Sequence, residues 1–513
     1  FHYTTLYLKM IGEIMKEWTR EERYRPLDKK DVPMLKELHE KIKTSIWRCQ
    51  FHVQTVTGLL GDTNGFSWFN GKWHLFYQWF PYGGVHGLKH WYHVESTDLV
   101  HWKNKGVGVI ADGPHDDHGA FSGSGFVEND ILYLPYTGNH RDENWVRYPR
   151  QLLAYMTKDG VFHKQEKPLY GNIEGYSEHQ RDPKMFYRPE DGYYYFMLGV
   201  QNLEKKGKFL LMRSESITEG WQVYGEMKIR GYEDFGFMVE CPALEKMGDK
   251  WLLVFSPQGL QPQGDDFQNI YNNTYFIGDM DFENIEFIPD GPFKELDHGF
   301  DFYAAQCAHQ DQFKDKAVLD AWFGISDMEY LPTVEQGYSG LQTMPRLLSI
   351  EGGKLKQRPV SATQELKGDI IEQSKEEFVL EQMPRACVIE IKGNDSDFML
   401  DLFKHEKHSG FVITYNQESQ TLIIDRGDLE NPINADYGTT RKLHLENGLQ
   451  ECTIFVDHSS VEMFINDGEY VSSSRIFPTL EEKQMVSTGN GNEVIVYQAK
   501  RTVEDDFIIY PEQ

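Results

Sequence analysis

A repeated pattern of turns and apolar strands constrains the fold of this chain more than any other feature. A Gly, Asn or Asp turn, an apolar strand and a polar exit recur in NGKWHLFYQWFP (70–81), ENDILYLPYTGN (128–139), PEDGYYYFMLGVQ (189–201), MGDKWLLVFSPQG (247–259) and DKAVLDAWFGISD (315–327). The five strands start at intervals of 58, 62, 58 and 67 residues. Regular multi-strand units of this kind predict a five-bladed β-propeller. A β-sandwich with chance spacing is the alternative.

The sequence patterns before and after these repeats predict other structures. Apolar residues at helical spacing predict two helices before residue 49, one within 7–15 and one within 31–42. After the Gly-rich stretch that begins at Gly352, short strands alternate with polar turns, which is typical of an antiparallel sandwich. We therefore predict an all-β chain with a helical N-terminal arm (1–48), a five-bladed propeller (49–352) and a C-terminal β-sandwich (353–513).

Composition excludes several classes of protein. Lys and Arg number 52 and Asp and Glu 80, so the formal charge is −28, which disfavours nucleic-acid or anionic membrane partners. The five cysteines form no CxxC pair, which argues against a zinc site or a disulfide framework. No apolar run is long enough to span a membrane, and no signal peptide is evident, so we expect a cytoplasmic protein. Its oligomeric state is left open.

Three acidic residues share one position in the repeat. Asp62, Asp182 and Glu240 each lie 11 residues before the first residue of a repeated strand, namely Trp73, Tyr193 and Trp251. Equivalent positions of different blades meet at the central channel, so the three carboxylates should converge at one mouth. Packed carboxylates raise the pKa of at least one member, and an ionised carboxylate beside a protonated one is what glycoside hydrolysis needs. For any one of these acidic residues, the alternative to a catalytic role is a place in a solvated turn.

The flanking residues support a sugar site. Glu240 lies in the apolar run VECPAL, where we expect desolvation to raise its pKa. Arg181 precedes Asp182 and can hold a neighbour ionised or bind a hydroxyl. FSGSG (121–125) supplies hydroxyl groups and an aromatic ring, and Gln78 supplies an amide.

These segments resemble the enzymes of glycoside hydrolase family thirty-two, the invertase and fructan-hydrolase family, over about residues 45–510. The family's NDPNG box corresponds to GDTNG (61–65), its RDP box to 181–183, its EC box to 240–241, its FSGS box to 121–124 and a further HW box to 90–91. The run from Val456 to Glu469 resembles the family's sandwich signature. The stretches FYQWFPYGGVHGLKHW and TGNHRDENWVR are similar to the bacterial branch that cleaves sucrose 6-phosphate.

The resemblance implies a retaining β-fructofuranosidase that needs no metal or organic cofactor. Asp62 would be the nucleophile, Glu240 the acid and base, and Asp182 the stabiliser of the transition state, with the Asp62 and Glu240 carboxyl groups about 5–5.5 Å apart. The substrate, a small sugar or sugar phosphate, would be held by the following residues: Gly61, Asn64, Gln78, His86, Trp91, Phe121, Ser122, Arg181 and Tyr303.

Two residues depart from the family's nucleophile box. Gly61 replaces an Asn that would help to hold fructose, and Thr63 replaces a Pro, which we expect to loosen the turn. Because all three carboxylates are retained, we expect a weakened or retuned hydrolase.

The substrate's phosphate is a separate question. A phosphorylated leaving group needs cations at the rim, and the candidates are Arg141, Arg147 and His86, with Lys294 and His298 as weaker ones. Two other functions stay open: a hydrolase of unphosphorylated sucrose or short fructans, and a sugar-binding protein without activity.

Overall fold

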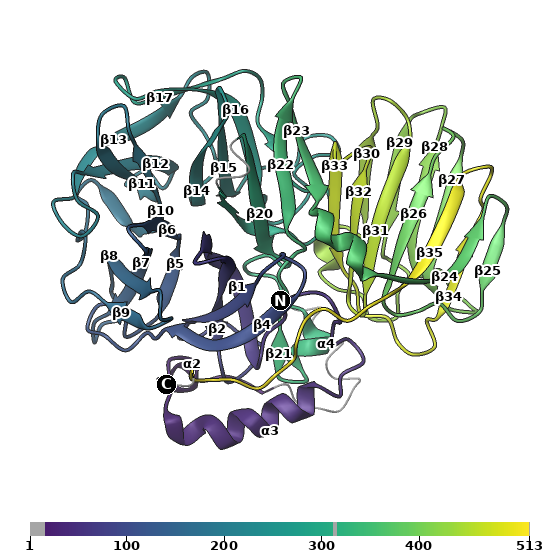
Figure 1. The fold of residues 1–513 in the computed structure, drawn as a ribbon, viewed down its shortest axis with the longest axis horizontal. Helices are drawn as coiled ribbons and strands as arrows, with labels where there is room; N and C mark the ends of the chain where they lie inside the picture. The colour runs from purple at the N-terminus through teal and green to yellow at the C-terminus, as the bar shows by residue number, and fades with distance from the viewer. Residues whose placement is uncertain (1–15, 311–314, 512–513) are drawn as a thin grey trace.

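The computed structural model describes residues 16–310 and 315–511 of the 513. They form a five-bladed β-propeller, beside which a two-sheet β-sandwich stands (Figure 1). The predicted helix within 7–15 lies outside the described residues. No helix in these two ranges is both long and apolar enough to cross a membrane.

Each of the five repeats forms one blade of antiparallel strands. The strands, given blade by blade, are β1 (Gly58–Phe69), β2 (Lys72–Phe80), β3 (His90–Ser96) and β4 (Trp102–Val109); β5 (Ala120–Gly123), β6 (Phe126–Glu128), β7 (Ile131–Arg141), β8 (Arg147–Thr157) and β9 (Phe162–Lys164); β10 (Tyr176–Arg188), β11 (Tyr193–Asn202), β12 (Gly207–Ser214) and β13 (Gln222–Ile229); β14 (Met238–Met247), β15 (Lys250–Gln258), β16 (Thr274–Asp281), β17 (Glu286–Pro289) and β18 (Lys294–Glu295); β19 (Tyr303–Ala308), β20 (Lys316–Trp322), β22 (Arg346–Glu351) and β23 (Lys354–Pro359). The predicted repeat strands are β2, β7, β11, β15 and β20, the second strand of each blade.

The ends of the propeller are joined through one short strand. β21 (Tyr338–Ser339), which lies between the last two hairpins of the fifth blade, pairs in parallel with the start of β1. The third and fourth blades are also joined, because β13 pairs in parallel with β17. The first strands of neighbouring blades contact one another in a closed ring: β1 with β5, β5 with β10, β10 with β14, β14 with β19 and β19 with β1.

The sandwich consists of two six-stranded sheets with an apolar core between them. One sheet contains β24 (Lys367–Ser374), β35 (Glu493–Ala499), β26 (Cys387–Lys392), β31 (Glu451–Asp457), β32 (Ser460–Ile465) and β33 (Tyr470–Arg475); the other contains β25 (Phe378–Leu380), β34 (Gln484–Ser487), β27 (Phe398–Lys404), β28 (Phe411–Asn416), β29 (Thr421–Asp425) and β30 (Thr440–His444). The predicted domain boundary at residues 352 and 353 falls in the turn between β22 and β23, which pair with each other.

Helices in the described chain are few and short. The predicted helix within 31–42 is α3 (Val32–Ile42), which buries Leu35 and Ile42. The others are α2 (Arg20–Arg23), η1 (Lys29–Asp31), α4 (Leu331–Val334), η3 (Ser361–Leu366) and η4 (Ala435–Tyr437). The imidazole of His39 in α3 bonds to the carbonyl oxygens of Val56 and Asp505, which ties the arm to the first blade and to the C-terminal segment.

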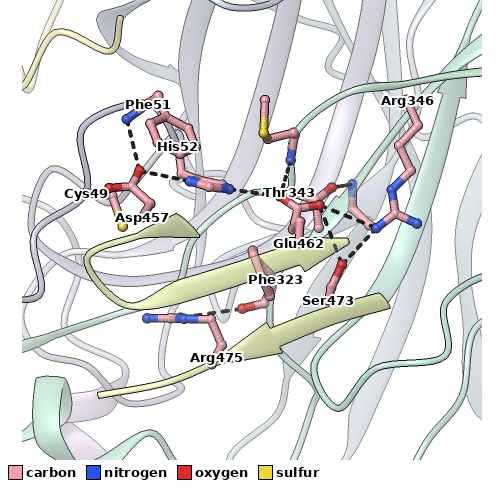
Figure 2. Close-up of polar contacts among 12 residues, drawn as sticks. Cys49, Phe51, His52, Phe323, Thr343, Arg346, Asp457, Glu462, Ser473 and Arg475 are labelled. Atoms are coloured by element: carbon pink, nitrogen blue, oxygen red, sulfur yellow. Dashed lines mark hydrogen bonds and ion pairs between the residues drawn. The ribbon is translucent and has the colours of Figure 1, made fainter. Parts of the chain in front are cut away.

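Buried charges join the propeller to the sandwich (Figure 2). His52, just before the first blade, contacts Asp457 through Nδ1 at 2.9 Å and Glu462 through Nε2 at 2.8 Å, and all three side chains are fully buried. Arg346 of β22 bonds to Ser473 Oγ at 2.8 Å and lies 3.5 Å from Glu462. Burial alone would lower the pKa of His52, but the two carboxylates outweigh it and raise this pKa to about 9. A positive imidazole therefore bridges two negative groups of the sandwich.

This contact makes stability depend on pH. The folded pKa of His52 exceeds the unfolded value of about 6.5, so the stabilisation is complete below pH 6.5 and is lost as pH rises through 9. We expect the apparent free energy of unfolding to fall by roughly 3 kcal/mol between pH 6 and pH 10, measured by chemical denaturation. His52→Gln should remove this part of the pH dependence, whereas His101→Gln, at the surface of the first blade, should keep it. A wild-type stability that rises over this interval would contradict the interpretation.

Candidate active site

The three predicted carboxylates lie on the first strands of three blades. Asp62 is on β1, Asp182 on β10 and Glu240 on β14. Phe121 and Ser122 on β5, and Tyr303 at the start of β19, occupy the first strands of the other two blades. The first strands of all five blades thus carry predicted site residues.

Every one of these first strands breaks its pairing register at the level of the site. The breaks fall at 60–63 in β1, 120–123 in β5, 181–184 in β10, 240–243 in β14 and 303–306 in β19. A bulge re-aims a side chain and bends its strand, and bulges are common next to active sites. The left-handed φ of 68° at Asp182 and of 46° at Cys241 belongs to the same distortion.

Glu240 is held by three side chains from three blades. Nε and one terminal nitrogen of Arg181 donate to its Oε1 at 2.8 and 2.7 Å. Its Oε2 accepts hydrogen bonds from Gln258 Nε2 at 2.9 Å and from the Tyr303 hydroxyl at 2.6 Å. Its orientation is therefore fixed.

Asp62 is positioned by a second set of polar groups. Its Oδ2 accepts a hydrogen bond from the Ser122 hydroxyl at 2.6 Å, and Gln78 donates to the same Ser122 oxygen at 2.9 Å. Asn64 donates to the backbone carbonyl of Asp62 and accepts from the Gly123 amide, so it joins the first two blades. Ser122, Gln78 and Asn64, which were predicted to bind the sugar, therefore hold Asp62 or its strand in place.

Asp182 bridges to the strand of Glu240. Its Oδ2 accepts the Cys241 amide at 3.0 Å, and its own amide donates to Thr137 Oγ1 at 3.0 Å. Burial and the nearby charge of Glu240 raise the pKa of Asp182 to about 7. Burial likewise raises the pKa of Asp62, against the opposing charge of Lys89.

The expected raised pKa of Glu240 is wrong. Burial pushes this pKa upward, as the apolar sequence context suggested, but the charge of Arg181 and the hydrogen bonds from Tyr303 and Arg181 outweigh burial and lower it. In the free protein Asp182 is therefore the carboxyl group with a raised pKa, and Glu240 the one with a lowered pKa. The error arose because the orientation of Arg181 across two blades is not visible in the sequence.

The loosened turn expected from Thr63 is also not what the structure shows. Thr63 is buried, and its hydroxyl donates to Gln342 Oε1 at 2.5 Å and lies 3.1 Å from Asp320 Oδ1. Gln342 Nε2 also donates to the carbonyl of Gly61. These bonds tie the turn of Asp62 to the fifth blade and replace the restraint of a proline ring by hydrogen bonds.

The remaining predicted residues divide into two groups. Trp91 is buried and donates its indole hydrogen to the carbonyl of Phe121 at 3.1 Å, so it supports β5. The Arg147 guanidinium lies 5.4 Å from the Phe121 ring centroid and contacts His179, which also contacts Arg181. Arg147 is therefore brought to the site through this chain of contacts.

The structure gives less support to the other residues proposed to contact the phosphate. Lys89 and burial lower the pKa of His86 far below its usual value, so in the free protein His86 does not supply a positive charge for a phosphate. Arg141 packs over Trp145 and donates to its carbonyl. Lys294 is exposed on β18, and His298 is oriented toward Tyr470 of the sandwich.

Sequence reasoning missed three residues at this site: Gln258, His179 and Lys89. Gln258 ends β15, the second strand of its blade, much as Gln78 lies near the end of β2. This recurrence of an amide at one end of the second strands was a usable signal. Lys89 stands directly before the HW box and carried no signal of its own.

A cavity of about 730 Å³ opens at the other end of the first strands, where Lys184, Glu245 and His309 lie among its walls. Glu245 is paired there with Lys184 at 3.1 Å and with His309 at 2.6 Å. The chemistry therefore belongs to the mouth that holds Asp62, Asp182 and Glu240.

A five-bladed propeller with converging acidic residues defines a glycoside hydrolase. The model of the Glycosyl hydrolases family 32 N-terminal domain matches residues 52–359, and that of the family's C-terminal domain matches residues 353–502. The chain belongs to glycosyl hydrolase family 32.

Similar proteins include bacterial and animal enzymes. A sucrose-6-phosphate hydrolase of Staphylococcus xylosus is 39% identical over 474 residues, which are 90% of this chain and 94% of that protein. The structure of a sucrose-6-phosphate hydrolase from Lactobacillus gasseri superposes with a TM-score of 0.88 at 35% identity, covering 95% of this chain and 100% of that one. A β-fructofuranosidase of Bombyx mori gives a TM-score of 0.79 at 31% identity, covering 93% and 100%.

Restoring the family's Asn at position 61 should raise activity. A Cβ at Gly61 would lie 3.6 Å from Gln78 Cβ, an ordinary contact, and the backbone there does not require glycine. One added hydrogen bond, worth about 0.5–1.5 kcal/mol, should raise kcat/KM in Gly61→Asn about two- to tenfold. The measurement is the initial rate on a β-fructofuranoside, and no gain would show that Gly61 costs the site nothing.

Tyr303 should set the pH range of the reaction. Its hydroxyl lowers the pKa of Glu240, so Tyr303→Phe should raise that pKa. Because Glu240 and Asp182 interact and titrate as a pair, the alkaline limb of kcat/KM against pH, which reports the free enzyme, should move to higher values. Tyr271→Phe is the matched control, because the Tyr271 hydroxyl donates to Asp327 rather than to Glu240. An unmoved alkaline limb in Tyr303→Phe would mean that Glu240 does not govern it.

Proposed function

We propose that this protein hydrolyses the β-fructofuranosyl bond of sucrose 6-phosphate, giving glucose 6-phosphate and fructose with retention at the anomeric carbon. The observation that carries the proposal is the convergence of Asp62, Asp182 and Glu240 from the first strands of three blades. The names of the similar bacterial proteins support the phosphorylated substrate.

In this proposal Asp62 attacks the anomeric carbon of the fructosyl unit. Its Oδ2 is oriented by Ser122, and the adjacent register break exposes the carboxylate to the channel mouth. Bond formation at Asp62 and cleavage of the bond to glucose give a covalent fructosyl–enzyme intermediate. Water activated by Glu240 then releases fructose with a second inversion, so the net outcome is retention.

Glu240 has to be protonated before it can donate to the leaving oxygen. In the free protein Arg181 keeps it ionised, while Asp182 has a pKa of about 7. We propose that fructosyl hydroxyl groups draw Arg181 away from Glu240. Burial then dominates at Glu240, and the pKa of Glu240 rises. In this proposal the proton held by Asp182 passes to Glu240, and Asp182 becomes the anion facing the oxocarbenium-like transition state.

The alternatives are a hydrolase of unphosphorylated sucrose or short fructans and a sugar-binding protein without activity. The presence of all three carboxylates, each held by defined partners, argues against the inactive alternative. The cytoplasmic location expected from the sequence stays a prediction.

Initial rates on sucrose 6-phosphate and on sucrose test the proposal. We expect a kcat/KM at least tenfold higher for the phosphorylated sugar, and loss of at least 10³-fold in Asp62→Asn because the nucleophile is removed. Val127→Ala, an exposed position on β6, is the control for handling and folding.

Equal rates on the two sugars would move the assignment to a general β-fructofuranosidase. Binding of either sugar without turnover would favour the inactive alternative.

A further inference from the structure

One cation at the site has no partner. Lys89 directly precedes β3, and its carbonyl accepts the amide of Ala120 at 2.8 Å. Ala120 begins β5, the strand that carries Phe121 and Ser122. The backbone of Lys89 is thereby fixed between the first and second blades, beside the groups that hold Asp62.

The ammonium group of Lys89 is unused. Within residues 16–310 and 315–511 it donates no hydrogen bond, forms no ion pair and covers no aromatic ring, although the residue is half-buried. Lys184, at the other end of the first strands, has its ammonium bonded to the Cys307 carbonyl at 2.6 Å and paired with Glu245. A partly buried cation normally finds such partners. The three hydrogens of Lys89 Nζ are therefore available to a ligand.

The surroundings of Lys89 are those of the reacting groups. Its charge acts on Asp62 and Glu240, and those carboxylates, with Asp327 and Asp182, act in turn on Lys89. The His86 ring next to it is kept neutral by this same charge and lies 6.2 Å from the ring of Trp322. Lys89 therefore belongs to the same site as Asp62 and Glu240, with its backbone bonded to the strand that carries Ser122.

The arginines of the site have at least one partner each, although the buried Nε atoms of Arg141 and Arg147 have none within the described residues. Arg181 binds Glu240, and Arg141 donates to the carbonyl of Trp145. Arg147 reaches the site from β8 in the second blade and contacts His179. Lys89 approaches from the first blade, on the side of His86.

We propose that Lys89 selects the phosphorylated leaving group by binding the 6-phosphate of the glucosyl unit; this rests on the proposed function. A phosphate dianion that enters a pocket containing several carboxylates needs a cation whose hydrogens are not already donated. An ammonium on a flexible stem can place two or three of them on phosphate oxygens. Unphosphorylated sucrose offers Lys89 only hydroxyl groups, so the charge-assisted part of the contact is absent.

The test compares kcat/KM on sucrose 6-phosphate and on sucrose for wild type, Lys89→Met and Lys89→Arg. Lys89→Met should reduce the preference for the phosphorylated sugar at least tenfold, chiefly through KM on that sugar. Because the charge of Lys89 also acts on Asp62 and Glu240, kcat/KM on sucrose should change as well, but by a smaller factor. Lys89→Arg, which keeps the charge, should restore part of the preference. Lys103→Met, an exposed lysine of β4, is the matched control and should leave the preference unchanged.

A second readout does not depend on turnover. Glucose 6-phosphate should inhibit wild type at lower concentration than glucose does, and Lys89→Met should remove most of this difference. An equal fall in kcat/KM on both sugars would overturn the proposal, because Lys89 would then act on Asp62 rather than on the substrate. An unchanged preference in Lys89→Met would also overturn it and would point to Arg147.

These outcomes separate the inference from the proposed function. A wild type without preference for sucrose 6-phosphate refutes both. A wild type that prefers it, with the preference retained in Lys89→Met, refutes only the role of Lys89.

Discussion

The closed ring of five first strands is the constraint on which the rest of this structure depends. A β-strand directs alternate side chains to opposite faces, so a regular strand cannot turn consecutive residues such as Arg181 and Asp182 toward one site. All five first strands break register where they pass it. The strained conformations at Asp182 and Cys241 persist because the Cys241 amide is bonded to the carboxylate of Asp182. This hydrogen bond therefore compensates for the backbone strain and also positions the carboxylate of Asp182.

The sandwich contributes to the site without reaching it. Glu462 of the sandwich accepts a hydrogen bond from the Met344 amide, and two residues earlier Gln342 bonds to Thr63 and to the carbonyl of Gly61. A single short segment therefore joins the buried His52–Glu462 contact to the turn that carries Asp62. Any movement of the sandwich against the propeller would strain this turn. The second domain is best understood as a brace for the nucleophile's strand.

Much of this could be predicted from sequence because a propeller repeats. The spacing of Trp73, Tyr193 and Trp251 fixes the blades, and counting back from them finds the three carboxylates. What the repeat does not encode is contact between blades. Arg181 lies next to Asp182 in sequence yet bonds to Glu240, so the sign of the Glu240 pKa shift was misjudged. Thr63 was expected to loosen its turn because its partners lie more than 250 residues away in the chain. Lys89 is a candidate because its ammonium has no partner within the described residues, and a sequence pattern does not show which side chains lack partners.

The balance of charge explains why one lysine can matter so much. The whole chain carries a formal charge of −28, and three of its carboxylates converge at the site, so the field of the protein repels an anionic substrate. Recognition of a phosphorylated sugar must therefore come from contacts inside the pocket, where water is largely excluded and charges interact more strongly. In the proposed mechanism Arg181 leaves Glu240 when the sugar binds, and Glu240 then takes up the proton that it donates. Lys89 donates no hydrogen bond within the described residues, so it can bind an anion without breaking another contact. Because its charge lowers the pKa of Glu240, a bound phosphate would offset that charge and favour the protonated form of Glu240. In this proposal one cation holds the charged leaving group while the other releases the acid.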